Sequence, residues 1–476
     1  MFERRSASLL AVAAAILLTS TAATPQPPAP RGPAARHLAL VGGMLLDGNE
    51  APPIHHAAIV IEGNKIVQVG PAAIVKIPSD ATIIDTSGMT MMPGMIEAHA
   101  HLAILGHGDY GRWFPWLAEH KAQFPPERIL EISAKQLLMA GVTAAIDLGG
   151  PMRESLSIRD RVQRGEAPGP RLQVSGPPIS HRDAPLPANA SVSLLAGTPI
   201  ASPQEAAAET ERHIQQGVDV IKCQVPLSYD EYVAIVGAAH KHNVKVHAHL
   251  YAERELRDAL HAGIDVLQHV GSAGVPLYSP SLIKEIVDAG RPVVPTAAHR
   301  VYVWPATLEF PERLQHPQLK KDFPPEIYAE VQDSLKDYRS LRYFNTTDRQ
   351  MFFADDDMKQ WITSGAVVGM GTDSGTPMNF HIDALWREAK AFVDHGMAPL
   401  RVISALTRIN SRIFGKPNDI GTIEPGKLAD IIVVHGNPLF DITALSQVTT
   451  VVKDGVVWKK DGVPVDASKP RSSSQR

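Results

Sequence analysis

Short apolar runs of strand length alternate with helix-like stretches through the middle of this chain, from residue 93 to residue 418. Repeated strand–helix units of this kind form parallel sheets with helices outside, and eight of them favour closure into a barrel. We therefore predict an α/β fold with a (β/α)8 TIM barrel over residues 93–418. The eight apolar runs, in chain order, are GMIEAHAHL, VTAAIDLGG, RLQVSG, VDVIKCQV, VKVHAHL, IDVLQHV, RPVVPTA and AVVGMGTDSG.

Residues 300–355 interrupt this rhythm with aromatic and charged side chains. A long stretch that departs from the strand–helix repeat is typical of a functional insertion. We expect an insertion after the seventh strand that forms a lid or a wall of the entrance.

The two ends of the chain have a different sequence pattern from the middle. Residues 37–92 read as short strands separated by Gly-Asn and Asp-Gly turns, and similar strands return over residues 419–465. We predict that these two segments pair into one small β-sandwich domain that brackets the barrel.

The first residues have the pattern of an exported protein. Two arginines precede a ten-residue apolar run and a stretch of small residues, which predicts a signal peptide over residues 1–23. An uncleaved anchor is the alternative. A proline-rich linker is expected over residues 24–36 and a disordered tail over residues 466–476. The predicted location is secreted or periplasmic, with no membrane association of the mature form.

The formal net charge of −4 gives no broad basic surface for nucleic acid, so the expected partner is a small-molecule substrate. A single cysteine, Cys223, excludes an intrachain disulfide. It stands in an apolar run, where a buried and inert thiol is expected.

Two histidines, His99 and His101, end the first of the eight strands. Side chains alternate faces along a strand, so both imidazoles point toward one spot. Two neutral imidazoles that converge make half of a typical metal site. Taken alone, the pair could equally be two exposed polar residues at the end of a strand.

Further polar residues fall near the ends of later strands. The active sites of eight-stranded parallel barrels lie at the carboxyl ends of the strands, so these side chains would face one cavity. Each one alone could be structural, but their coincidence favours a metal site. They are Lys222 in the fourth strand, His247 and His249 in the fifth, His269 in the sixth and Asp373 in the eighth.

The stretches that carry these residues resemble the amidohydrolase superfamily. The matching motifs are PGMIEAHAH, IK, VHAHL, QH and GTDSG, together with GTIEPGKLADIIVV near the C-terminus. The resemblance is strongest to the prolidase and imidazolonepropionase-related group. Two positions depart from the usual pattern, because Glu97 replaces an aspartate and Gln268 replaces a glutamate. Both positions concern hydrogen bonds around the ligands rather than the ligands.

The resemblance implies two divalent metal ions, with zinc as the expected metal. His99, His101 and Asp373 would hold one ion, and a fifth-strand histidine with His269 would hold the other. Lys222 would bridge the ions as a carboxylated lysine, because burial near cations favours the neutral amine that adds CO₂.

Either His247 or His249 could be the fifth-strand ligand, since both lie on one face of the strand. His249 lies nearer the carboxyl end, and alignment of the following helix with the family pattern also favours it. His247 would then sit deeper, in a structural or hydrogen-bonding role.

The implied enzyme is a metal-dependent hydrolase of carbon–nitrogen bonds that acts on an amide or peptide, such as a dipeptide or an N-acyl amino acid. A metal-bridging hydroxide would attack the carbonyl, and Asp373 would carry the proton to the leaving nitrogen. Barrels of this superfamily often form homo-oligomers, but the sequence fixes no number.

Two His-Arg pairs follow the third and seventh strands and could meet a substrate carboxylate, because arginine offers two parallel donors. Solvated loop residues would look the same. The pairs are His181 with Arg182 and His299 with Arg300.

Three other functions fit the same pattern: a deaminase or a lactonase/esterase of the same superfamily, or a non-catalytic binding protein. The deaminases place a glutamate three residues after the fifth-strand histidine. Counting from His249, that position is Ala252, and Glu253 comes one later. An intact ligand set argues against the binding protein.

Overall fold

The computed structural model describes residues 37–183, 197–271 and 277–466, without the side chains of residues 342–349. The expected signal peptide and linker, and the expected tail apart from residue 466, lie outside these residues. None of the described helices is long and apolar enough to cross a membrane.

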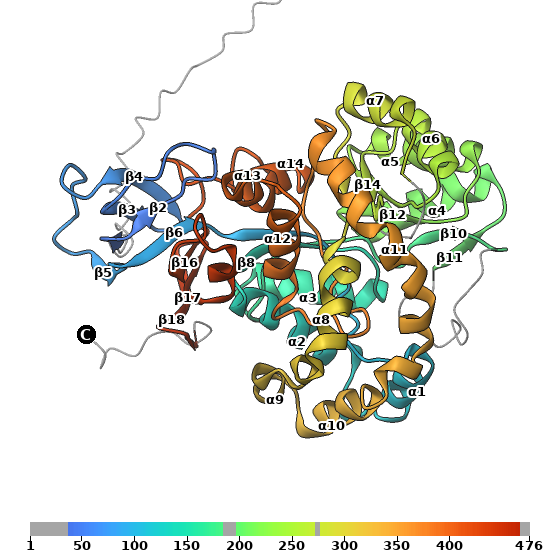
Figure 1. Cartoon of the computed structure of the whole chain (residues 1–476), viewed down its shortest axis with the longest axis horizontal. Coiled ribbons are helices and arrows are strands. Elements are labelled where there is room, and N and C mark those ends of the chain that lie inside the picture. Colours follow the sequence, from blue (N-terminus) through green and yellow to red (C-terminus); the bar gives the residue numbers. More distant parts are fainter. Residues whose placement is uncertain (1–36, 184–196, 272–276, 467–476) are drawn as a thin grey trace, which may run out of the picture. The chain divides into compact units, whose positions relative to one another are not determined.

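Parallel strands form the centre of the described chain and confirm the predicted α/β class (Figure 1). A three-stranded parallel sheet contains β7 (Met95–Ala100), β8 (Val142–Asp147) and β9 (Arg171–Val174). A six-stranded parallel sheet has the order β11 (Thr198–Ile200), β10 (Ile179–His181), β12 (Val220–Gln224), β13 (Lys245–His249), β14 (Val266–Gln268) and β15 (Val293–Val294). The short strands β10 and β11 were not predicted.

The predicted eighth strand, residues 366–375, forms only isolated bridges, to Val293 in β15 and to Ala100 in β7. A Cβ atom at Gly371 would lie 2.8 Å from the Cβ of His99, and Asp373 has a left-handed φ of 57°. This close approach and this turn prevent a regular ladder. The segment still bonds to β7, because the Asp373 amide donates to the His99 carbonyl at 2.9 Å.

Helices connect the parallel strands, and α4 to α7 lie around β12 and β14 in Figure 1. Ser202, Ser228 and Ser279 cap three of them by accepting a hydrogen bond from the backbone amide three residues later. The helices are α1 (Tyr110–Glu119), α2 (Pro126–Met139), α3 (Met152–Gln163), α4 (Pro203–Gln216), α5 (Tyr229–Lys241), α6 (Glu253–Ala262), α7 (Pro280–Ala289), α12 (Ala384–Asp394), α13 (Pro399–Ser404) and α14 (Asn410–Ile413).

The insertion after β15 is helical and packs against α1. Trp113 in α1, Trp304 and Ile327 in the insertion, and Phe380 share one buried cluster. His107 Nε2 lies 3.1 Å from Glu330 Oε1, which ties the loop after β7 to the insertion. The insertion comprises η2 (His299–Val303), α8 (Trp304–Glu309), η3 (Pro311–Gln315), α9 (Pro317–Asp322), α10 (Pro325–Ser334), η4 (Tyr338–Ser340) and α11 (Arg342–Thr363).

Two further sheets are built from the terminal segments: the first has N-terminal strands alone, and the second combines strands from both ends of the chain. One has the order β4-β3-β1-β5, and the other has the order β19-β18-β17-β16-β6-β2. Leu40, Ile59, Met91, Ile431 and Val452 belong to one buried cluster shared by these sheets. The strands are β1 (His37–Val41), β2 (Met44–Leu45), β3 (Ala57–Glu62), β4 (Lys65–Pro71), β5 (Thr82–Asp85), β6 (Met89–Pro93), β16 (Ile431–His435), β17 (Val448–Lys453), β18 (Val456–Lys460) and β19 (Val463–Pro464).

Candidate metal centre

Three predicted ligands from the end of β7 and from residues 366–375 converge. His99 Nε2 lies 3.3 Å from His101 Nε2, and Asp373 Oδ1 lies 3.1 Å from His101 Nε2 and 3.6 Å from His99 Nε2. The alternation of side chains along β7 brings the two imidazoles to one side, as predicted. Asp373 reaches them because its segment runs directly beside β7.

The histidines of β13 and of the end of β14 join the same cluster. The ring centroid of His269 lies 4.4 Å from that of His99 and 4.2 Å from that of His249. Ligand atoms of His99, His269 and Asp373 all lie within 4.8 Å of one another. Such spacing among buried nitrogen and carboxylate atoms suits a metal ion.

Hydrogen bonds at Nδ1 orient two of these imidazole rings. His99 Nδ1 lies 2.8 Å from Gln268 Oε1, and His269 Nδ1 lies 2.9 Å from the Thr296 hydroxyl. A metal-ligating histidine characteristically donates its second ring nitrogen to such a partner, which leaves Nε2 as the ligand atom. Gln268 therefore takes the place of the glutamate usual at this position.

Glu97 joins β7 to the segment that carries Asp373. Its carboxylate accepts hydrogen bonds from the His99 amide at 2.9 Å, the Thr372 amide at 3.0 Å and the Thr372 hydroxyl at 2.7 Å. Burial raises the pKa of Glu97 to about 8, against the opposing effect of these donors. Glu97 is one methylene longer than the aspartate usual at this position, and it still joins β7 to the segment of Asp373.

Lys222 is the most unusual polar group of the cluster. Its side chain is 2% exposed, and Nζ has no hydrogen-bond partner among the described residues. Burial lowers its pKa to about 7, while the charge of Asp373 opposes the shift. Cys223, the next residue along β12, is buried as predicted.

The two candidate histidines of β13 have different surroundings. His249 lies beside His269, and its ring centroid is also 4.5 Å from that of Tyr251. His247 is fully buried and is paired in register with Lys222, and its Nδ1 lies 3.0 Å from Gln268 Nε2. His249 therefore lies among the clustered histidines, and its role as the ligand stays a prediction.

The protonation states of the clustered side chains favour the binding of cations. Burial is the main cause of the lowered pKa values of His99, His249 and His269, and the charge of Lys222 lowers them further. Burial opposes ionisation of Asp373, but its hydrogen bond to His101 and the nearby histidines hold its pKa well below the usual value. Neutral imidazoles and an ionised carboxylate are the forms that bind metal.

One predicted substrate-binding pair lies near this cluster. Arg300 is 3% exposed, and its charge acts on His249, His269 and Asp373. His299 is fully buried, with Nε2 3.1 Å from the Pro377 carbonyl, and burial lowers its pKa to about 3.

The other predicted pair lies among residues of α4 and α5. Arg182 is exposed and pairs with Glu205 at 3.1 Å. His181 Nε2 lies 3.7 Å from Glu231 Oε1. These contacts direct both side chains toward the helices, so a role in substrate binding stays a prediction.

Tyr251 is a residue of the cluster that sequence reasoning did not select. Its ring lies beside His249, and its centroid is 6.0 Å from that of His269. Its position two residues after His249 continues the inward-facing alternation of β13, and that spacing could have identified it.

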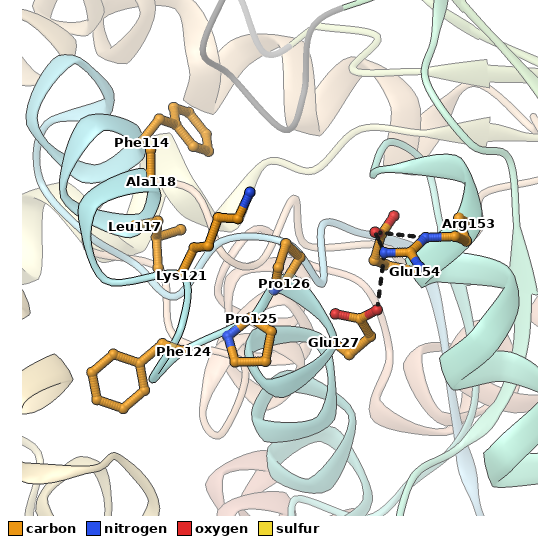
Figure 2. Close-up of a pocket in the computed structure, with 10 residues that line it drawn as sticks. All are labelled: Phe114, Leu117, Ala118, Lys121, Phe124, Pro125, Pro126, Glu127, Arg153 and Glu154. Carbon is orange, nitrogen blue, oxygen red and sulfur yellow. Dashed lines mark hydrogen bonds and ion pairs between the residues drawn. The ribbon is translucent and has the colours of Figure 1, made fainter.

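A separate pocket of about 350 Å³ lies where α1, α2 and α3 meet, and Figure 2 shows the Arg153 guanidinium between the Glu154 and Glu127 carboxylates. None of the predicted site residues lines it. The lining residues are Phe114, Leu117, Ala118, Lys121, Phe124, Pro125, Pro126, Glu127, Arg153 and Glu154.

The residues present fit divalent metal ions. His99 and His101 place two ring nitrogens 3.3 Å apart beside an ionised carboxylate, an arrangement that a cation between them would stabilise. The orphaned amine of Lys222 lies in the same buried region and lacks an anionic partner.

The chain matches the model of the amidohydrolase family over residues 90–457, which is more than half of its length. It belongs to the amidohydrolase family. Ochratoxinase of Aspergillus niger is 25% identical over an alignment of 467 residues, which covers 89% of this chain and 87% of the relative. The family match and the ochratoxinase match together show that this amidohydrolase is a hydrolase that acts on carbon–nitrogen bonds.

Solved structures have the same fold. A prolidase-like protein from Bifidobacterium longum has a TM-score of 0.69 and 24% identity, and the match covers 91% of this chain and 97% of that protein. A Xaa-Pro dipeptidase crystallised with methionine has a TM-score of 0.69 and 22% identity, with coverage of 89% and 100%. At these identities the similarities show the fold alone, and the prolidase and imidazolonepropionase-related group stays a prediction.

Proposed function

We propose that this amidohydrolase is an exported binuclear-metal enzyme that hydrolyses the amide or peptide bond of a dipeptide or an N-acyl amino acid. The observation that carries the proposal is the buried, unpartnered Lys222 beside the converging histidines and Asp373. A single metal site would not need a lysine there, whereas a carboxylated lysine can bridge two ions.

His99, His101 and Asp373 would hold one ion, and His249 and His269 the other, with carboxylated Lys222 between them. Zinc is the metal we expect. Bound ions would polarise the scissile carbonyl and acidify the attacking water.

Asp373 and Arg300 have separate roles in this proposal. The carboxylate of Asp373 takes a proton from the attacking water and returns it to the leaving nitrogen. Arg300 places a buried positive charge near this carboxylate, where it would hold the carboxyl end of a substrate. This favours substrates that carry a carboxylate, such as the Xaa-Pro dipeptides after which the structurally similar dipeptidase is named.

A deaminase is the main competing function within the family. The position three residues after His249 is Ala252, which stands at the N-cap position of α6 and has no carboxylate. The next residue, Glu253, bonds to Ser279 and Arg257 instead. The residue pattern therefore favours amide hydrolysis.

The proposal includes the fold that holds the site. We expect the parallel strands to close into an eight-stranded barrel, supported by the bridges of residues 368 and 374 and by the bond from the Asp219 amide to the Val174 carbonyl at 3.0 Å. The shared core of the two terminal sheets supports a β-sandwich. Export, and assembly into homo-oligomers, are further expectations of the proposal.

The first test is the metal content of the purified protein, measured by elemental mass spectrometry together with hydrolysis of dipeptides and N-acyl amino acids. We expect about two ions per chain in the wild type. Lys222→Met should lose at least one ion and lower activity by at least about a hundredfold, because a bridging ligand is absent. Lys241→Met, at the end of α5, is the matched control and should change neither value.

The other outcomes identify the competing functions. One ion per chain with release of ammonia from amino-heterocycles would indicate a deaminase. Two ions with hydrolysis of lactones or esters alone would indicate an esterase. No metal, even after incubation with zinc and bicarbonate, would contradict the proposal and favour a binding protein.

A further inference from the structure

Lys222 and His247 are partners on neighbouring strands, and both present a buried polar atom without a partner. The two residues are paired in register between β12 and β13, so their side chains lie on the same side of the sheet. Lys222 Nζ and His247 Nε2 have no hydrogen-bond partner among the described residues. Such groups are costly to bury, so they indicate a missing partner.

The hydrogen bonds of Gln268 determine where the proton of His247 lies. Gln268 Nε2 is 3.4 Å from the Ala98 carbonyl, which can only accept, so the amide nitrogen faces that side. The same nitrogen lies 3.0 Å from His247 Nδ1, and it therefore donates to this atom. A neutral His247 that accepts at Nδ1 must carry its proton on Nε2.

The proposed metal ligation requires the same orientation. His99 can offer Nε2 to a metal only if Nδ1 carries the proton, and that proton needs the oxygen of Gln268 as acceptor. The amide nitrogen then faces His247. Lys222 and His247 are thus two donors next to each other, and the described side chains supply neither with an acceptor.

We propose that the Nε2–H group of His247 donates a hydrogen bond to the carbamate formed on Lys222 and thereby stabilises the carboxylated lysine. This inference rests on the carboxylation that the proposed function includes. It assigns His247 as a positioning residue, and it makes Gln268 the link between the ligand His99 and the bridging group.

The carboxylation itself uses dissolved CO₂. The lone pair of the neutral Lys222 amine forms the N–C bond, one C=O electron pair moves to oxygen, and a proton leaves the nitrogen for the solvent. The amine thus becomes an anion with two oxygens. One oxygen can accept from His247, and lone pairs remain for the ions. A hydrogen bond to a charged acceptor is among the stronger ones, so we expect its loss to lower carbamate occupancy by roughly tenfold or more.

The experiment measures the carbamate directly, without reference to activity. Protein is equilibrated with ¹³C-bicarbonate, with and without zinc, and the carbamate carbon is quantified by NMR at a bicarbonate concentration that half-saturates the wild type. His247→Leu removes the donor, whereas His247→Gln places an amide N–H near the position of Nε2. Gln268→Glu keeps the side-chain size but accepts from both rings, which moves the His247 proton to Nδ1.

We expect a reduced carbamate signal in His247→Leu and Gln268→Glu, and a signal close to that of the wild type in His247→Gln. Circular dichroism shows whether each variant is folded, and a folded Gln268→Glu variant decides the question if His247→Leu does not fold. An undiminished signal in the folded variants, or no carbamate in the wild type, would overturn the inference. Neither result depends on the substrate, so a failure of the proposed amide hydrolysis would be recognised separately.

Discussion

At the scale of single residues, a buried carboxyl group outside the histidine cluster links stability to pH. Asp357 in α11 is 1% exposed, and neither carboxylate oxygen has a partner among the described residues. Burial raises its pKa from 3.8 to about 7, and the charge of Asp356 adds to the shift. The folded protein therefore retains a proton on Asp357 that the unfolded chain releases.

We predict that Asp357→Asn stabilises the protein at pH 8 but not at pH 4. The stability associated with protonated Asp357 is fully present below about pH 4 and is lost as the pH rises through about 7. The neutral amide avoids this loss, which is on the order of 2 to 4 kcal/mol for a shift of this size. Urea unfolding at both pH values measures the difference.

Asp461→Asn is the control for this experiment, because Asp461 is exposed in the turn between β18 and β19 and does not contribute to the pKa shift of Asp357. It should leave the free energy of unfolding nearly unchanged at both pH values. If Asp357→Asn had the same effect at pH 4 as at pH 8, ionisation of Asp357 would not be its cause.

The sequence indicated those residues of the site whose positions follow from a local pattern. The spacing of His99 and His101 predicted two converging imidazoles, because alternation along a strand is a local property. The role of Gln268 was not predictable, since it contacts His99 and His247 on two other strands. Such bonds depend on the register between strands, which the order of residues does not reveal.

At the scale of secondary structure elements, a single side chain holds the segment that carries Asp373. Asn410 in α14 is fully buried. Its amide donates to the Ile96 carbonyl at 2.5 Å and the Met370 carbonyl at 2.7 Å, and its oxygen accepts from the Met370 amide at 3.0 Å. These bonds replace part of the ladder that β7 and residues 366–375 do not form.

We predict that Asn410→Ala destabilises the protein by about 3 to 5 kcal/mol, because three buried backbone groups lose their partner. It should also weaken metal retention during dialysis, since Asp373 lies three residues after Met370. Asn49→Ala, which removes a bond to Glu424 at the surface, is the control. Normal metal retention in a destabilised Asn410→Ala would show that Asn410 does not position Asp373.

The elements differ in how well the sequence indicated them. Seven of the eight predicted barrel strands are present as parallel strands. The eighth is irregular because Gly371 lets the backbone approach His99, and glycine alone does not reveal what approaches it. Strands β10 and β11 have only three residues each, too few for a recognisable period.

At the scale of the whole molecule, the two chain ends and the parallel strands depend on each other. Strand β16 pairs with β6 in five register positions, and β6 continues through Gly94 into β7, which carries His99 and is followed directly by His101. The Gly94 amide donates to the Asp430 carbonyl at 2.9 Å. The C-terminal strands thus support the strand that leads into the candidate metal centre.

Arg171 makes this dependence testable, because it joins β9 to the terminal sheets. Its guanidinium donates to Asp430 Oδ2 at 2.6 Å and also bonds to Asp454. The side chain of Asp430 is only 3% exposed, and its other oxygen accepts from the Asp454 amide at 2.8 Å. Loss of the guanidinium would leave a buried carboxylate without its charge partner.

We predict that Arg171→Ala lowers the free energy of unfolding by about 3 to 5 kcal/mol, as when one partner of a buried ion pair is removed. The free energy of unfolding of Arg171→Lys should lie between those of the wild type and Arg171→Ala. The lysine ammonium keeps the positive charge but lacks the planar pair of donors of a guanidinium. Arg164→Ala is the control, since its pair with Glu166 is exposed and contributes little. Urea unfolding of the four proteins at pH 7 checks the order. If Arg171→Ala were no less stable than Arg164→Ala, the terminal sheets would not depend on this link, and their support of the metal centre would rest on strand pairing alone.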